Sequence, residues 1–376
     1  MRDRLRGLTA LLPPVVGSVS TLHPRGSAPP LGALGLDDLD VLRMVLRGGS
    51  VVDWTHLHFD RMDEIDAFLR VNELDSNDPL DRERMRDLHA RSIAYLENHL
   101  GFKSLPPEVV EVEDVRNLFL LASGKFRRRA KSYACMTLKV MHILHYQEGH
   151  ELLARLPMSG AEVSILLRAK LERMMRGMLE RRLPIVAFEG NTKTNDSMLS
   201  KLLAKKDTQA TKVFDKLRFR IVVERVEDIP SLMVTFMQEL TPFNYLVPNQ
   251  SDNTLFEVDG LLSRAGNTAA LRSAPEEMNE PPETQLGLHR KNEFSGPTYR
   301  VVSFVTEVPV RIDRIMPLEG RAVERLGRIV FGTMELQIVD VASAERNESG
   351  ENRHALYKQR QKLRVKERLQ KGRRRD

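Results

Sequence analysis

The spacing of hydrophobic residues divides the chain into a helical first half and a second half in which helices alternate with strands. Between residues 37 and 157 the apolar side chains recur mostly at steps of three and four, the period of one helix face. The preceding segment carries five prolines between residues 13 and 30, which disfavour both helix and strand. We therefore expect a flexible leader at 1–36 and an all-helical domain at 37–157.

The pattern beyond Pro157 predicts a sheet packed with helices. Ser159 and Glu162 form a capping-box signature, and the helix that follows carries an apolar stripe that ends before Pro184. Runs rich in β-branched and aromatic residues then indicate strands at 185–189, 219–223, 299–305, 308–312 and 328–339. Helical spacing recurs at 197–205, after Asp228 and at 354–369.

This order of elements predicts an α+β protein, in which an all-helical N-terminal domain precedes a mixed-sheet α/β domain at 158–345. Within the second domain, the polar and turn-rich residues 248–297 are expected to form a long loop. Residues 346–376 are expected to form a basic C-terminal helix or tail.

Charge is concentrated at the C-terminal end. The 376 residues carry a net charge of +6, but 358–376 holds ten Lys or Arg against two acidic residues, which is +8 and leaves about −2 elsewhere. Basic tails of this kind can bind RNA or acidic partners. The alternative, which the sequence favours, is a solvated terminal helix that only aids solubility.

The sequence predicts a cytoplasmic protein. No apolar run reaches the roughly 20 residues that a membrane-spanning helix needs, so no membrane partner is expected. The single cysteine, Cys135, excludes an internal disulfide and fits a reducing compartment. Arginines near the N-terminus precede an apolar stretch, as in a signal peptide, but Pro13 and Pro14 interrupt that stretch. Assembly into a homo-oligomer is left open.

Common catalytic signatures are absent from the sequence. It contains no Gly-x4-Gly-Lys-Ser/Thr phosphate loop, no His-Glu-x-x-His, no cysteine pair for zinc and no Gly-x-Ser-x-Gly. His142 and His145 share a helix face, with His150 close by. Because this spacing supplies only two metal ligands, structural roles are favoured for these histidines over a metal site.

Lys193, Ser197 and Lys201 recur at steps of four across the junction between a predicted strand and the helix that follows it. The N-terminus of a helix offers unpaired N–H groups to an anion, so lysines gathered there suit a polyphosphate. A surface helix with scattered lysines would show the same spacing.

Two carboxylates lie on or beside predicted strands. Asp215 begins one strand, and Glu335 shares a strand face with Gln337 while its apolar neighbours face the other way. Carboxylates from neighbouring strands could hold Mg²⁺, which commonly takes one or two carboxylates together with substrate phosphates. A strand with one solvated face explains the same alternation.

These residues resemble a known family in four separated runs. The runs Lys193-Thr-Asn-Asp-Ser197-Met-Leu-Ser-Lys201 and Val213-Phe-Asp215-Lys-Leu-Arg-Phe-Arg220 resemble the synthetase domain of RelA/SpoT-type alarmone (ppGpp) synthetases. Met334-Glu335-Leu-Gln337-Ile338 is similar to their Glu-Val-Gln-Ile strand, and Gly350-x3-His354-x2-Tyr357-Lys358 matches the helix that follows it. The resemblance covers about 185–358, and the helical half does not resemble the family's hydrolase domain.

The resemblance implies a nucleotidyltransferase-like fold and roles for individual residues. Asp215 and Glu335 would hold Mg²⁺, with Gln337 supporting this catalytic site. The ATP phosphates would contact Lys193, Ser197, Lys201 and Arg220. Tyr299 would stack on the acceptor purine, and His354 would belong to the nucleotide-binding helix. Such enzymes transfer the β,γ-pyrophosphoryl group of ATP to the 3′ hydroxyl of GDP or GTP in the bacterial stress response.

The chain departs from the family mainly on the acceptor side. Asn191 stands where the family has a phosphate-contacting arginine, Arg218 replaces a small residue, and the acceptor loop reads Pro297-Thr298-Tyr299-x-Val301-x-Ser303. The leading hypothesis is an enzyme, a Mg²⁺-dependent pyrophosphokinase that uses ATP and a nucleotide or other hydroxyl acceptor. The alternatives are an inactive nucleotide- or RNA-binding regulator on the same fold, and an interaction scaffold that works through its helical half.

Overall fold

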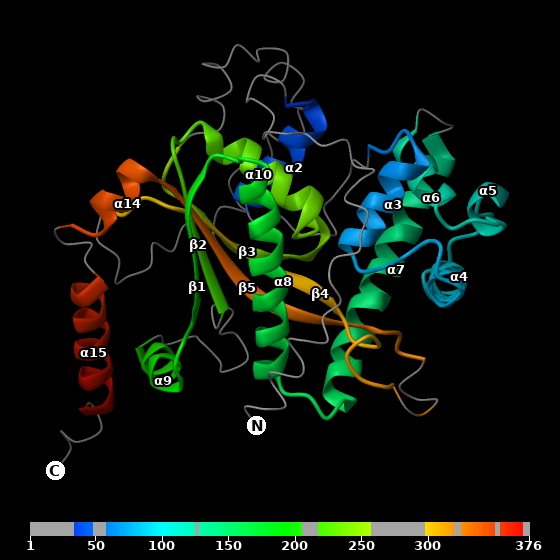
Figure 1. The fold of residues 1–376 in the computed structure, drawn as a ribbon. Helices are drawn as coiled ribbons and strands as arrows, with labels where there is room; N and C mark the ends of the chain where they lie inside the picture. Colours follow the sequence, from blue (N-terminus) through cyan, green and yellow to red (C-terminus); the bar gives the residue numbers. More distant parts are fainter. Residues whose placement is uncertain are drawn as a thin grey trace.

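The computed structural model describes residues 34–47, 58–124, 128–204, 217–256, 298–318, 320, 325–349 and 354–370 (Figure 1). Within them one five-stranded sheet has the order β1-β2-β5-β4-β3. Its strands are β1 Ile185–Thr192, β2 Leu217–Val223, β3 Leu246–Asn253, β4 Val302–Arg311 and β5 Ile329–Asp340. The β2–β5 pair is parallel and the other pairs are antiparallel, so the predicted mixed sheet is confirmed.

The N-terminal half is helical in the described residues, as predicted. Its α-helices are α2 Leu36–Arg47, α3 Met62–Val71, α4 Pro79–Ala94, α5 Pro107–Val110, α6 Asn117–Ser123 and α7 Arg128–Arg155, with a π-helical turn at Tyr95–His99 after α4. The expected leader lies outside the described residues as far as residue 33.

The remaining helices alternate with the strands and pack on them. They are α8 Gly160–Glu180, α9 Asn195–Ala204, α10 Asp228–Glu239, α14 Val341–Asn347 and α15 His354–Gln370, with a short 3-10 turn at Phe243–Tyr245. The capping box of α8 is present, because the Ser159 hydroxyl accepts from the Glu162 N–H and the Glu162 carboxylate accepts from the Ser159 N–H.

One face of the sheet is apolar and forms the main core. Phe219, Phe304 and Leu336 are fully buried there against α8, α10 and α2, and Figure 1 shows α8 and α10 lying across the sheet. Gly332 of β5 lets α8 approach closely, because a Cβ at this position would lie 3.0 Å from Val163 Cγ1. Burial of this apolar surface supplies the driving force that holds the layers together.

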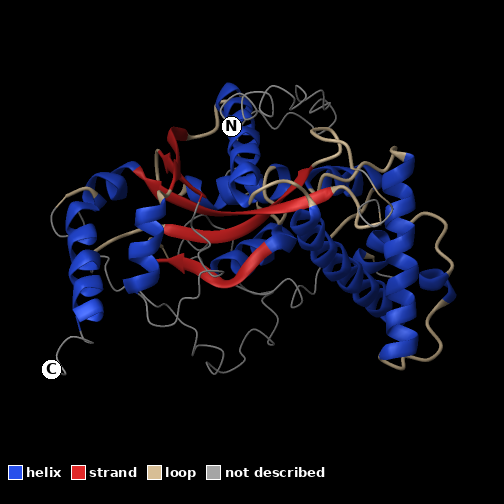
Figure 2. Ribbon diagram, turned by 90° about the horizontal axis from the view of Figure 1, so that it is seen from below, coloured by secondary structure: helices blue, strands red, loops and turns tan. Residues whose placement is uncertain are grey.

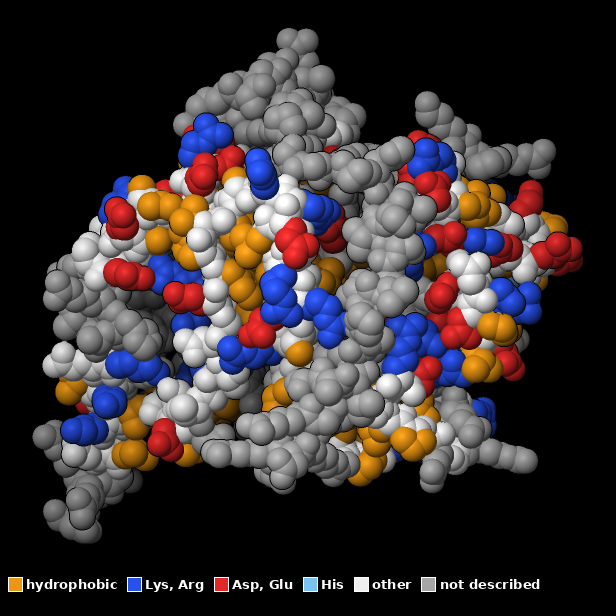
Figure 3. All heavy atoms as spheres, viewed as in Figure 1, with side chains coloured by type: hydrophobic (Ala, Val, Ile, Leu, Met, Phe, Trp, Pro, Cys, Tyr) orange, Lys and Arg blue, Asp and Glu red, His pale blue; other side chains and the backbone are white. Residues whose placement is uncertain are grey.

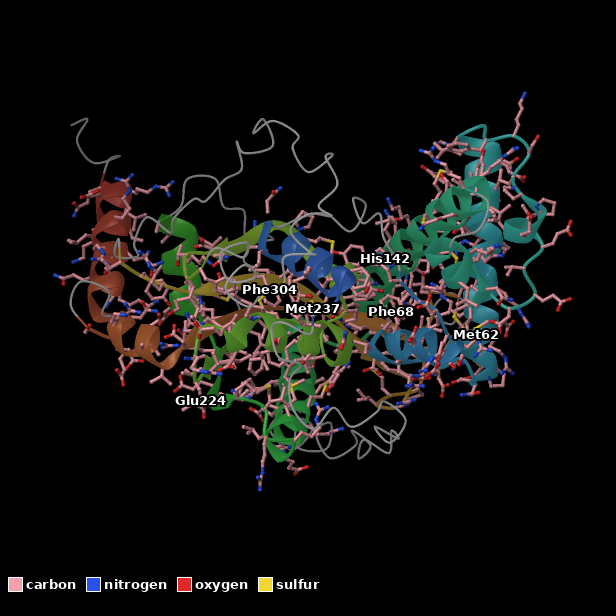
Figure 4. The ribbon with its side chains drawn as sticks, turned by 90° about the horizontal axis from the view of Figure 1, so that it is seen from above. Met62, Phe68, His142, Glu224, Met237 and Phe304 are labelled. Carbon is pink, nitrogen blue, oxygen red and sulfur yellow. The ribbon has the colours of Figure 1, made fainter. Side chains whose placement is uncertain are left out.

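A second core lies among helices α3 to α7, beside one end of the sheet (Figure 2). Phe331 and Ile329 of β5 belong to this core, and Gly149 of α7 packs directly against both residues. In Figure 4, Met237 and Phe304 mark the sheet core, while Phe68 and His142 mark the helical side. Helix α2 packs with the sheet core, and a domain boundary at residue 157 stays a prediction.

Two strand predictions need correction. The strands expected at 299–305 and 308–312 are one strand, β4, which pairs with β5 through Pro309. Pro309 fits because β3 pairs with β4 only as far as Thr306, so the missing N–H lies on an unpaired edge.

The expected loop at 248–297 begins as strand β3, which runs through residue 253. Its polar side chains hid the strand, because β3 is an edge strand with three exposed residues in its middle. A register irregularity between Leu246 and Ser251, and a positive φ of 58° at Asn249, further break the alternation. Residues 257–297 of the expected loop lie outside the described residues.

Candidate functional site

The second face of the sheet carries polar side chains in two rows that run across the strands. Arg218 of β2 lies opposite Glu335 of β5 in one row, and Arg220 lies opposite Gln337 in the next. Residues that pair in register point to the same face of a sheet, so two cations and a carboxylate share this surface. All four side chains are partly exposed. The predicted orientation of Glu335 and Gln337, away from the buried Leu336, is therefore the observed one.

Three lysines, from α9, from the segment just before it and from α15, lie on the same side of the sheet. Lys193 lies between β1 and α9, Lys201 lies two turns into α9, and Lys358 lies near the start of α15. The Lys358 ammonium donates to Ser197 Oγ of α9 at 3.2 Å. The two helices pack side by side, since Arg368 Nη1 of α15 also donates to the Leu203 carbonyl of α9 at 2.7 Å.

The pKa of Lys193 is lowered by its burial and by the neighbouring cations. Burial, which has the largest effect, lowers this pKa to about 7 together with the charges of Lys201, Arg218 and Lys358, while the charge of Glu335 opposes the shift. Burial, with Arg218 as a neighbour, also lowers the pKa of Lys358. A site with this balance of charge favours an anion, because an anion relieves the repulsion among the cations.

Arg220 is positioned to accept an anionic ligand. Its Nη1 forms an ion pair with Glu348 Oε1 at 3.1 Å, and Glu348 is itself largely exposed. The Nε and Nη2 atoms of Arg220 are buried and donate to no acceptor among the described residues. Buried donors without acceptors are costly, so the guanidinium group has hydrogen bonds to offer a phosphate.

Glu335 is held by its strand neighbour. Gln337 Nε2 donates to Glu335 Oε1 at 2.8 Å, which fixes the carboxylate among Arg218 and Lys193. Oxygen ligands such as this carboxylate suit Mg²⁺. Within the described residues no group of three His, Cys, Asp or Glu side chains is arranged to hold a metal ion. Asp215, the second expected ligand, lies outside the described residues.

Tyr299 joins the site from the segment that precedes β4. Its carbonyl accepts a hydrogen bond from Thr254 Oγ1 at 3.1 Å, which ties this segment to the end of β3. Burial raises the pKa of the Tyr299 hydroxyl, Arg220 and Arg218 lower it, and Glu335 and Asp252 raise it. The tyrosine therefore lies beside both rows of polar residues.

The structure thus gathers most of the residues that the sequence singled out, namely Lys193, Ser197, Lys201, Arg220, Tyr299, Glu335 and Gln337. His354 begins α15, and its side chain lies outside what the structure describes. Arg218, Lys358 and Asp252 were not assigned to the site from sequence. Strand alternation with Arg220 could have indicated Arg218, whereas Lys358 was counted with the basic tail and Asp252 with a loop.

The surroundings of His142 and His145 indicate that these histidines have structural roles. Both lie where α7 meets the end of the sheet, His145 buried and His142 half-buried; His142 Nδ1 lies 3.2 Å from Asn244 Nδ2, and His145 packs edge-on against Phe331. Burial lowers their pKa values to about 4 and about 3, so both rings are neutral at pH 7. Neutral rings in an aromatic cluster fit the structural interpretation.

Basic side chains continue along α15 beyond the site (Figure 3). This helix carries Lys358, Arg360, Lys362, Arg364, Lys366 and Arg368. In the described part of the chain, none of the helices combines the length and the apolar character needed to cross a bilayer.

Fold and site together define a mixed-sheet α+β protein with a cationic, carboxylate-bearing sheet face suited to a polyphosphate. No protein-family model and no curated protein matches the chain. Among solved structures it is similar to a GTP pyrophosphokinase family protein from Streptococcus pneumoniae, with 14% identity over 58% of this chain and 87% of that chain, at a TM-score of 0.30.

Two proteins from Bacillus subtilis are also similar. Small alarmone synthetase 1, bound to its product pppGpp, shares 15% identity over 56% of this chain and 87% of that chain, at a TM-score of 0.32. Small alarmone synthetase 2 shares 14% identity over 59% of this chain and 96% of that chain, at a TM-score of 0.27. These proteins are of the type that the motif residues resemble.

Proposed function

We propose that the protein is a Mg²⁺-dependent pyrophosphokinase that transfers the β,γ-pyrophosphoryl group of ATP to a hydroxyl group of a nucleotide of the GDP or GTP kind. The observation that supports this most is the convergence of Lys193, Lys201, Arg218, Arg220 and Lys358 around the carboxylate of Glu335. Five cations can neutralise a triphosphate and the charge that moves during its cleavage.

The reaction assigns a task to each part of this surface. The lysines and Arg220 bind the ATP phosphates and hold the β-phosphorus in line with the acceptor hydroxyl. The acceptor oxygen bonds to the β-phosphorus, the bond from that phosphorus to the α,β-bridging oxygen breaks, and AMP leaves. Glu335 takes the hydroxyl proton, and the hydrogen bond from Gln337 keeps its carboxylate oriented.

The carboxylates fit a magnesium ion. Glu335 and Asp215 would hold it together with phosphate oxygens, as Mg²⁺ sites commonly do. When bound, the ion neutralises charge on the transferring phosphates. Since the cations outnumber the carboxylates around Glu335, we expect Mg²⁺ to bind with the nucleotide rather than before it.

Transfer of label from ATP tests this function. The purified full chain is incubated with Mg²⁺ and γ-labelled ATP, alone and with GDP, GTP, ADP or RNA. We expect a labelled nucleotide with one acceptor, and its loss in Asp215→Asn and Glu335→Gln. Glu345→Gln, which changes an exposed carboxylate on α14, is the matched control and should retain activity. Equal activity in all variants would refute the assignment.

A nucleotide-binding regulator without catalysis is the second candidate, and Arg218 favours it. A cation opposite Glu335, where the resembled family has a small residue, competes with a metal ion for the carboxylate. This candidate predicts ATP binding without a labelled product. If the basic helix also binds RNA, deleting 359–376 should weaken RNA binding and reduce its salt dependence.

A further inference from the structure

Asp252 adds a carboxylate to the polar sheet face at the edge opposite the lysines. It lies on β3 opposite Ser303 of β4, which lies opposite Gln337 of β5, which in turn lies opposite Arg220 of β2. The four residues therefore form one row on one face. Three strand spacings of roughly 4.8 Å separate Arg220 from Asp252, about 14 Å in all.

Hydrogen bonds fix Asp252 relative to Tyr299. Thr254, two residues after Asp252, donates its hydroxyl to the Tyr299 carbonyl and accepts from the Val301 N–H at 3.0 Å. Its own N–H donates to the Val301 carbonyl at 3.0 Å. The charge of Asp252 also contributes to the raised pKa of the Tyr299 hydroxyl, so the two side chains are neighbours. Both are partly exposed on the same surface.

The row is polarised, with cations at one end and a carboxylate at the other. A phosphate bound beside Asp252 would be repelled, so this end suits the part of a ligand that donates hydrogen bonds. Tyr299 offers an aromatic ring on which a base can stack. A carboxylate at the edge of a stacked base accepts two parallel N–H bonds from guanine N1 and N2, whereas adenine presents an acceptor at N1.

We propose that Asp252 is the residue that selects the acceptor base, by accepting hydrogen bonds from the N1–H and N2–H groups of a guanine stacked on Tyr299. The inference rests on the proposed function, because it takes the acceptor to be a nucleotide on this sheet face. Its ribose and phosphates lie on the side of the base that faces away from the Asp252 carboxylate. The base edge is thus read from β3, a strand that carries none of the phosphate contacts.

Binding of four nucleoside diphosphates tests this assignment. Affinities of the full chain for GDP, IDP, XDP and ADP are measured by calorimetry, for the wild type, Asp252→Asn and Asp60→Asn. IDP lacks the N2 amino group, and XDP carries a carbonyl oxygen there. Asp60 is an exposed residue before α3, so its substitution removes the same charge away from the sheet.

The wild type and Asp60→Asn should bind GDP roughly ten- to a hundredfold more tightly than IDP, which corresponds to one hydrogen bond to a charged group. ADP should bind more weakly still. Asp252→Asn should lose the preference for GDP over IDP and gain affinity for XDP, because its amide can donate to the C2 carbonyl. Tyr299→Leu should weaken the binding of all four nucleotides and leave the ratio of the GDP and IDP affinities unchanged.

Equal affinities of the wild type for GDP and IDP would overturn the inference. An equal loss of affinity for all four nucleotides in Asp252→Asn would overturn it too, since that result indicates that Asp252 contacts the ribose and not the base. Failure of the proposed function has a different signature, in which GDP binds selectively and no label is transferred from ATP. No binding of any nucleotide would overturn both.

Discussion

At the residue scale, Lys193 carries the clearest electrostatic signature of the site. Its side chain is partly buried and its pKa is held near 7 by burial, Lys201, Arg218 and Lys358, against the attraction of Glu335. A phosphate placed among these groups would favour the charged form of Lys193 and raise the pKa. Ligand binding and protonation of this lysine are therefore linked.

The linkage predicts how affinity changes with pH. Below pH 7 Lys193 is charged in the free protein, and ATP binding needs no proton. Above pH 7 the free lysine is neutral and must take up a proton on binding, so affinity for ATP should fall as pH rises from 7 to 9. Calorimetry without Mg²⁺ checks this, with Lys193→Met expected to give weaker and nearly pH-independent binding. The same fall in ATP affinity with pH in the wild type and in Lys193→Met would contradict this linkage.

The same pKa predicts a contribution to stability. In the unfolded chain a lysine titrates near 10.4, so between pH 7 and 10 the unfolded state binds more protons than the folded state. The contribution of Lys193 to the free energy of unfolding therefore increases with pH across this window. Denaturant unfolding at pH 7 and pH 9 should show this increase in the wild type and a smaller one in Lys193→Met.

At the element scale, α15 belongs to the site rather than to a free tail. Lys358 near its start and Arg368 near its end both contact α9, and this packing brings Lys358 close to Lys193. Regular helical spacing predicted the element, but no local pattern distinguishes Lys358 from the basic residues that follow it on the same helix. Only the packing of α15 on α9 makes that distinction.

Lys358→Ala should weaken ATP binding about tenfold, because a hydrogen bond to a charged group is worth roughly 1.5–3 kcal/mol. Lys366→Ala, an exposed position on the same helix, is the matched control and should change affinity little. Equilibrium binding of a fluorescent ATP analogue measures both. Equal losses in the two variants would assign α15 a diffuse electrostatic effect instead of a contact.

Gly149 sets how closely α7 approaches β5. A Cβ at this position would lie 2.3 Å from Phe331 Cε2 and 2.9 Å from the Ile329 carbonyl oxygen. Gly149→Ala should therefore destabilise the protein by about 1–3 kcal/mol through overpacking. Gly177→Ala, in a helix position with open space around its Cβ, should be neutral or stabilising by about 0.5–1 kcal/mol. Urea denaturation of the two variants compares them directly.

At the scale of the whole molecule, an ion-pair network joins the helical half to the sheet. Arg311 of β4 donates from Nη1 to Asp81 of α4 at 2.5 Å and from Nη2 to Asp78 at 2.9 Å, and its Nε donates to Asp313 at 2.9 Å. The side chains of Arg311 and Asp81 are each only 4% exposed. Loss of one partner would leave the other charge buried without compensation.

Arg311→Leu should accordingly reduce the free energy of unfolding by about 3–5 kcal/mol. We expect the helices and the sheet to unfold in one transition, because Phe331 and Ile329 of β5 belong to the helical core. Arg168→Leu, which removes an exposed pair with Glu172 on α8, should cost at most about 1 kcal/mol. Two separate transitions in the wild type would contradict the expected cooperativity.

The sequence by itself determined the order of the main helices and strands, and which face of β5 carries Glu335 and Gln337. These features follow from local period, since alternation and helical spacing are properties of consecutive residues. It did not determine β3, whose polar edge gives no alternating signal, or the continuity of β4 through Pro309. Tertiary structure alone decided that Lys193, Arg218 and Lys358 meet around Glu335, because contacts between distant segments depend on how the layers pack.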